Sequence, residues 1–143
     1  MDKKYIFLDF DGVMHPDGKQ AFSCAEYFAD CIKDKNNLFI VFSTSWREYS
    51  TIEKLSSYLP SSIRNKCIGK TPLLKNHYKH VRYHEIMAYN SEKLIGDNNW
   101  IALDDMAIIF PPNCKNLILT NPRNGFGERE AHLVHKFYEN NFF

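Results

Sequence analysis

Four short apolar runs, each ending in polar residues, constrain the fold of this chain more than any other feature of its sequence. They are residues 5–8, 38–42, 100–103 and 116–119. Unbroken apolar runs of this length predict strands that are buried on both faces, as in a parallel sheet. A weaker fifth strand is expected at 66–68, just before Gly69.

The segments between these runs are typical of helices, at about 21–35, 47–58, 81–93 and 128–138. Alternating strands and helices predict βαβ units and therefore an α/β fold with a mostly parallel five-stranded sheet. Residues 45–48 match the S-x-x-E capping box, so we expect Ser45 to cap the second helix. A length of 143 residues suits a single domain over 1–143.

Composition narrows the class of protein. A net charge of +1 argues against strong, sequence-independent binding to long nucleic acid, which usually needs a basic excess. The four cysteines have no zinc-like spacing. The apolar run near the N-terminus is far too short for a signal sequence or a membrane span. We therefore expect a cytoplasmic protein that does not bind membranes, and nothing in the sequence indicates a stable protein partner.

The polar residues that follow the strands predict a site at one rim of the sheet, because ligands of open α/β sheets bind beyond the carboxyl ends of the strands. Asp9 and Asp11 are two residues apart, so their side chains point to the same side of an extended chain. Two carboxylates that converge repel one another unless a cation or a proton lies between them, and Mg²⁺ suits oxygen ligands. The alternative is a solvated turn.

Asp104 and Asp105 follow another buried strand and predict a second acidic group at the same rim. The alternative for this pair is a helix N-cap. Ser43 and Thr44 follow a third strand, where a hydroxyl and the N–H groups of a helix start would bind phosphate. The alternative there is a cap at the end of the strand.

A phosphoryl group also requires a fixed cation. We expect Arg82 in this role, because it lies near the start of a helix and its planar fork suits phosphate oxygens. Lys70 is the second candidate. An ordinary surface cation is the alternative for both.

In these motifs the chain resembles the haloacid-dehalogenase (HAD) superfamily of phosphatases and phosphotransferases. Residues 9–13 match the first motif, Ser43 matches the second, and Asp104–Asp105 match the fourth, in the family's order. The third motif is usually a lysine, so Arg82 is a departure from the commoner form. The resemblance implies a three-layer α/β/α Rossmann-like core. Only 31 residues lie between Asp11 and Ser43, and 38 between Ser43 and Arg82, so a separate cap domain does not fit.

The resemblance implies a Mg²⁺-dependent phosphatase that acts through an aspartyl-phosphate on Asp9. Asp11 would be the general acid and base, and Ser43, Thr44 and Arg82 would bind phosphate. The metal ligands would be Asp9, Asp11 through its backbone carbonyl, and Asp105, with Asp104 adjusting their surroundings.

More narrowly, the chain is similar to the small, capless "Swiss army knife" HAD group, which is proposed to include RNA-repair-like enzymes. The substrate implied is a phosphorylated molecule, such as a nucleotide or a nucleic-acid end. The stretch 70–84 contains no acidic residue. It includes Lys75, His77 and Lys79, which would attract a polyanion. A solvated loop is the alternative. Three functions remain open: a general phosphomonoesterase, a nucleic-acid end-processing phosphatase, and a non-catalytic module that binds metal or phosphate.

Overall fold

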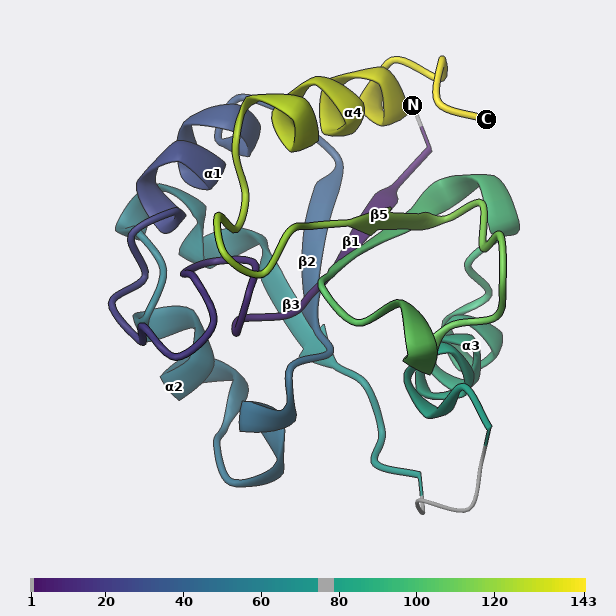
Figure 1. Cartoon of the computed structure of the whole chain (residues 1–143). Helices are drawn as coiled ribbons and strands as arrows, with labels where there is room; N and C mark the ends of the chain where they lie inside the picture. Colours follow the sequence, from purple (N-terminus) through teal and green to yellow (C-terminus); the bar gives the residue numbers. More distant parts are fainter. Residues whose placement is uncertain (1, 75–78) are drawn as a thin grey trace.

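The computed structural model describes residues 2–74 and 79–143. Its centre is a five-stranded sheet in the order β3-β2-β1-β4-β5, and every neighbouring pair is parallel (Figure 1). The strands are β1 (Lys4–Leu8), β2 (Leu38–Phe42), β3 (Cys67–Lys70), β4 (Trp100–Asp104) and β5 (Leu117–Leu119). The α/β class and the parallel sheet expected from the apolar runs are therefore confirmed.

Within the described residues, four α-helices and several short 3-10 turns connect the strands. The helices are α1 (Ala25–Ile32), α2 (Ile52–Ser57), α3 (Val81–Lys93) and α4 (Glu128–Tyr138). The 3-10 turns are η1 (Ser45–Glu48), η2 (Ser61–Lys66), η3 (Asp97–Asn99) and η4 (Ala107–Ile109). The helix α1 forms because its buried residues recur at helical spacing, at positions 25, 28, 29 and 32.

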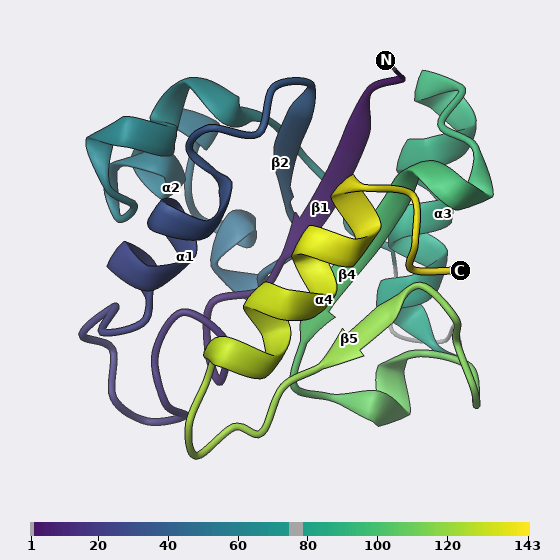
Figure 2. The same cartoon turned by 90° about the horizontal axis from the view of Figure 1, so that it is seen from above.

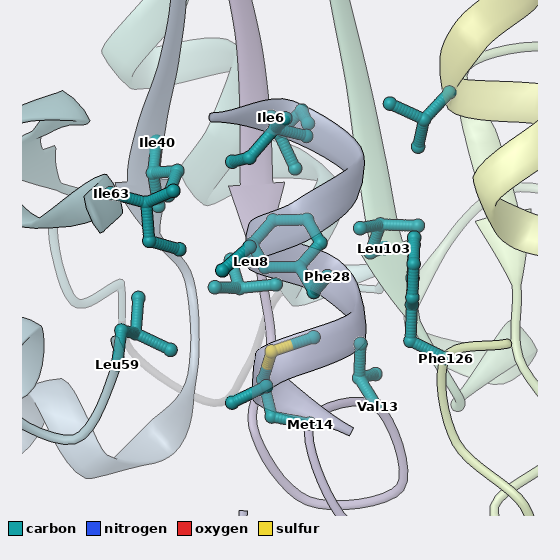
Figure 3. Close-up of a cluster of buried hydrophobic side chains, with 14 of the residues drawn as sticks. Ile6, Leu8, Val13, Met14, Phe28, Ile40, Leu59, Ile63, Leu103 and Phe126 are labelled. Carbon is teal, nitrogen blue, oxygen red and sulfur yellow. The ribbon is translucent and has the colours of Figure 1, made fainter. Parts of the chain in front are cut away.

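The helices cover both faces of the sheet and produce three layers. Helices α1 and α4 lie side by side on one face and α3 lies on the other (Figures 1 and 2). Alternate residues of β1 point to opposite faces of the sheet. Ile6 and Leu8 pack with Phe28 of α1 (Figure 3), whereas Phe7 packs with Ile86 of α3. This arrangement confirms the α/β/α core.

The first two predicted helices differ from the observed ones. The helix expected from residue 21 begins only at Ala25, because Phe22 has a left-handed backbone (φ 51°) and places its ring against Phe10. The helix expected at 47–58 is divided into η1 and α2. Thr44 caps the first piece and Thr51 caps the second, so the cap predicted at Ser45 is wrong.

The described residues form no folded unit outside these three layers, in agreement with the expected absence of a cap domain. In the same part of the chain, no helix has the length and apolar character that crossing a membrane requires.

Candidate functional site

Three polar residues lie in a row at the carboxyl ends of the central strands. Leu8 of β1 is in register with Phe42 of β2 and with Leu103 of β4. The next residues along these strands are Asp9, Ser43 and Asp104. Backbone hydrogen bonds continue the sheet at this level, since Asp9 N–H donates to Leu103 (3.1 Å) and Ser43 N–H donates to Leu8 (3.0 Å). The parallel register therefore brings residues from distant parts of the sequence to one point.

Asp9, Asp104 and Asp105 form an acidic cluster in which one carboxylate oxygen from each lies within 4.8 Å of the others. Asp9 and Asp104 are buried, and Asp105 is half-buried. Burial raises the pKa of Asp9 well above its ordinary value, and the carboxylates of Asp104 and Asp105 raise it further against the opposing effect of Arg82. Burial and Asp104 likewise raise the pKa of Asp105. Oxygen donors that repel one another in this way suit a hard divalent cation such as Mg²⁺.

Arg82 contributes the cation of the site from the first turn of α3. Its Nη1 lies 2.7 Å from Oδ2 of Asp104 and 3.4 Å from Oδ1 of Asp9. Burial alone lowers the pKa of Arg82, but these two carboxylates outweigh that effect and raise it. The Nε–H of Arg82 is buried and has no hydrogen-bond acceptor among the described residues. The guanidinium thus has both a fixed charge and an unused donor at the rim.

Ser43 is buried in the same row, and its hydroxyl has no hydrogen-bond partner in the described part of the chain. A buried hydroxyl without a partner is costly, so this oxygen is suited to an acceptor supplied by a ligand. The neighbouring Thr44 hydroxyl accepts a hydrogen bond from Trp46 N–H at 3.3 Å and caps η1. Thr44 therefore fixes the turn that follows Ser43.

Lys70, the second candidate for the cation, is engaged elsewhere. Its Nζ donates to the backbone oxygens of Arg47 (3.3 Å) and Ser50 (3.0 Å), away from the acidic cluster. Of the basic stretch at 70–84, Lys75 and His77 lie outside the described residues.

Arg47 is a buried structural residue. Its guanidinium donates to the backbone oxygens of Ser43, Thr44 and Thr71, each within 3.1 Å, and forms a 2.7 Å ion pair with Glu85 of α3. These bonds attach the turn after β2 to the loop after β3 and to the helix that carries Arg82.

Asp11 follows Asp9 by two residues, and its carboxylate is bound by groups outside the acidic cluster. One oxygen is 2.8 Å from Nε2 of His15 and the other accepts from Nε1 of Trp46 at 2.9 Å. Neither contact could be predicted from the sequence. Trp46 is 35 residues away from Asp11, and a histidine four residues beyond Asp11 in a loop has no defined orientation.

Gly12 allows the chain to pass close to Asp105. Its φ is +77°, and a β-carbon at this position would collide with the Asp105 carboxylate. The Thr120 hydroxyl donates to Gly12 O at 2.7 Å and holds this turn against the end of β5. The D-x-D-G pattern predicts the sharp turn. The structure adds that the Asp105 carboxylate occupies the space beside Gly12.

A cleft of about 810 Å³ opens beside Asp105. It is lined by Asn121 and Asn124 of the turn after β5 and by Glu128 and Arg129 at the start of α4. Space for a large substituent is therefore present next to the acidic cluster.

Comparisons with known proteins identify the family of the chain. The family model described as the HAD domain in Swiss Army Knife RNA repair proteins matches residues 5–131, a range that includes every residue of the rim described above. No curated protein and no solved structure matches the chain. The family indicates a HAD-fold hydrolase or a role related to repair. With the match extending over most of the chain and the parallel sheet in agreement, the protein belongs to the HAD domains of the Swiss Army Knife RNA repair family.

Proposed function

We propose that this protein is a Mg²⁺-dependent phosphomonoesterase whose nucleophile is Asp9. The observation that carries the proposal is the meeting of the carboxylates of Asp9, Asp104 and Asp105 with the Arg82 guanidinium. The Ser43 hydroxyl, at the end of the neighbouring strand, has no hydrogen-bond partner among the described residues. Hydrolysis of a phosphate monoester requires a nucleophile, a positive charge and hydrogen-bond donors at one point, and these residues supply each of them.

In the proposed reaction, a carboxylate oxygen of Asp9 bonds to phosphorus as the bond from phosphorus to the leaving oxygen breaks. Asp11 gives its proton to that leaving oxygen. Asp11 then takes a proton from water, whose oxygen attacks phosphorus and releases phosphate from Asp9. Ser43 and Arg82 donate hydrogen bonds to the phosphoryl oxygens in both steps. Thr44 fixes the turn after Ser43, and its hydroxyl proton would donate to the same phosphoryl group.

Mg²⁺ would be held by Asp9, the backbone carbonyl of Asp11 and Asp105, with Asp104 orienting Arg82 beside it. When bound, the ion neutralises negative charge on the carboxylates and the phosphoryl oxygens. Burial and the neighbouring carboxylates raise the pKa of Asp9 despite Arg82, so a further cation at this point would be favoured.

A nucleic-acid end is the second candidate substrate. The family's description as a domain of RNA repair proteins favours it, and so does the 810 Å³ cleft beside Asp105. The chemistry at phosphorus is the same for both candidates, so only the leaving group distinguishes them.

The test is hydrolysis of 4-nitrophenyl phosphate with Mg²⁺ by the wild type and by Asp9→Asn, followed by a panel of sugar phosphates, nucleotides and 3′- or 5′-phosphorylated oligonucleotides. We expect activity that requires Mg²⁺ and falls at least ~10³-fold in the variant. Preference for oligonucleotides would select the repair function. No activity on any member of the panel, together with a melting temperature that Mg²⁺ raises, would instead indicate a binding module.

A further inference from the structure

The Asp11 carboxylate is bound on both oxygens by side chains that have no other assigned role. His15 Nε2 lies 2.8 Å from Oδ1, and Trp46 Nε1 donates to Oδ2 at 2.9 Å. His15 is fully buried, whereas the Asp11 side chain is 37% exposed. Asp11 therefore faces solvent from a position that two interior groups determine.

The hydrogen-bonding chemistry of these two groups assigns the donors. An indole nitrogen can only donate, so Trp46 must approach an oxygen that accepts. His15 Nδ1 is buried without a partner among the described residues. A proton on Nδ1 would leave a buried donor unsatisfied, so we assign the proton that faces Asp11 to Nε2, which donates it to the carboxylate.

Neighbouring aromatic rings prevent these donors from moving. The Trp46 ring contacts Phe10, Phe22 and Tyr58 at centroid distances of 5.3, 5.5 and 5.3 Å, all nearly perpendicular. The His15 ring meets Phe22 edge-on at 4.7 Å. The direction of each N–H is thus fixed by packing before any substrate binds, which is the usual basis of a preorganised site.

We propose that His15 and Trp46 are positioning residues that fix the rotation of the Asp11 carboxylate and leave its outward lone pairs for proton transfer. This inference rests on the proposed function, because it assigns Asp11 the role of acid and base. The positioning role accounts for two hydrogen bonds to Asp11, which lies outside the acidic cluster. One comes from His15 in the β1–α1 loop and the other from Trp46 in η1.

The contact can be tested without any catalytic assay. The chain has two tryptophans, so a ¹H–¹⁵N spectrum shows two indole N–H peaks. The peak that Trp46→Phe removes belongs to Trp46. We expect Asp11→Ala to move this peak upfield, because the N–H loses its carboxylate acceptor, while the Trp100 peak stays in place. An unmoved Trp46 peak would overturn the proposal.

Kinetics test the role of the contact. Proton donation by Asp11 matters for an alkyl phosphate, whose leaving alkoxide is a strong base, and much less for 4-nitrophenyl phosphate. We expect Trp46→Phe and His15→Leu each to lower kcat/KM for the alkyl phosphate ~10-fold or more, and to lower it less for 4-nitrophenyl phosphate. We compare kcat/KM because it reports transfer of the phosphoryl group to Asp9 and excludes the later hydrolysis step, which both substrates share. Trp100→Phe is the matched control, because it makes the same substitution at the other tryptophan, whose ring packs on Phe7 and Tyr83 in the other core cluster.

Adding Trp46→Phe to Asp11→Asn should produce no further loss, since a positioning residue acts only through the group it positions. Equal losses of kcat/KM on both substrates, or an additional loss in the Asp11→Asn background, would contradict the positioning role. A wild type inactive on every phosphate ester would instead overturn the proposed function, and the indole spectrum would still report on the contact itself.

Discussion

Asp9 occupies an unfavourable position unless a ligand is bound. It is buried, and two other carboxylates lie within 4.8 Å, with Arg82 as the opposing charge. Burial, Asp104 and Asp105 together raise its pKa. In the folded state Asp9 therefore binds its proton more tightly than in the unfolded chain. The folded protein is favoured below the unfolded pKa and loses stability as pH rises from there through the folded pKa.

Replacing the Asp9 carboxylate with a neutral amide should therefore stabilise the protein in the absence of metal. At pH 7 without divalent ions, we expect Asp9→Asn to raise Tm by about 3 °C or more, equivalent to ~1 kcal/mol for a domain of this size. Arg82 keeps Asp104 as its nearer partner in the variant. Calorimetry at pH 7 and at pH 3 measures the effect, which should shrink at the lower pH.

Addition of Mg²⁺ supplies the control for this measurement. Binding to the native state stabilises the wild type more than Asp9→Asn, so the difference in Tm should narrow or reverse as the ion is added. A variant less stable than the wild type at neutral pH without metal would contradict the assigned electrostatics.

Gly12 offers a matched pair of substitutions with Gly18. Both have a positive φ (+77° and +79°), but a β-carbon at Gly18 meets nothing within 4 Å, whereas one at Gly12 collides with Asp105. We expect each alanine variant to lose ~1 kcal/mol of unfolding free energy from its strained backbone. Only Gly12→Ala should also lose most of its Mg²⁺ affinity, measured by calorimetric titration. Equal affinities in the two variants would show that the Asp105 contact does not shape the site.

Individual residues show where sequence reasoning succeeds and where it stops. Asp9, Ser43 and Asp104 could be placed together because each follows an apolar strand, and the register of a parallel sheet converts that position into proximity. The roles of His15 and Trp46 could not be predicted, because loop rotations direct their donors and no periodic pattern records them.

At the level of secondary-structure elements, Arg47 links three segments that lie far apart in the sequence. It donates to the turn after β2 and to the loop after β3, and its ion pair with Glu85 joins both to α3. We expect Arg47→Met to cost about 3–5 kcal/mol of unfolding free energy, because Glu85 would remain buried without its counter-charge. Urea denaturation measures the loss.

Two further variants separate charge from packing. Adding Glu85→Gln to Arg47→Met removes the uncompensated charge while an amide oxygen remains for Leu74 N–H, so part of the stability should return. The exposed Arg123→Met should change stability by no more than ~0.5 kcal/mol. A loss from Arg47→Met as small as that of Arg123→Met would exclude a structural role for the network.

Element boundaries follow the strength of the periodic pattern. The predicted limits of β2, α3 and α4 agree with the structure, because their apolar spacing is sustained and no competing cap interrupts it. The segment 47–58 is different. Thr51 caps its own helix by accepting from Lys54 N–H, and this local bond divides a stretch that looks continuous in sequence.

The whole molecule presents its rim without a covering domain in the part of the chain that the structure describes. If nothing closes over the substrate, the size of the leaving group should matter little. We expect kcat/KM for a 5′-phosphorylated decanucleotide to lie within ~10-fold of that for the mononucleotide, with a shallow salt dependence because the net charge is only +1. Exclusion of the longer substrate by several orders of magnitude would contradict an open site.

The most direct measurement is a crystal structure of the protein with Mg²⁺ and beryllium fluoride, an analogue of a phosphorylated aspartate. We expect beryllium bonded to the Asp9 carboxylate, Mg²⁺ bound by Asp9 and Asp105, and fluorine atoms hydrogen-bonded to the Ser43 hydroxyl and to Arg82. An ion bound away from these carboxylates, or an Asp9 that stays free of beryllium while another residue carries it, would contradict the assignment of Asp9 as the nucleophile of a metal-dependent phosphatase.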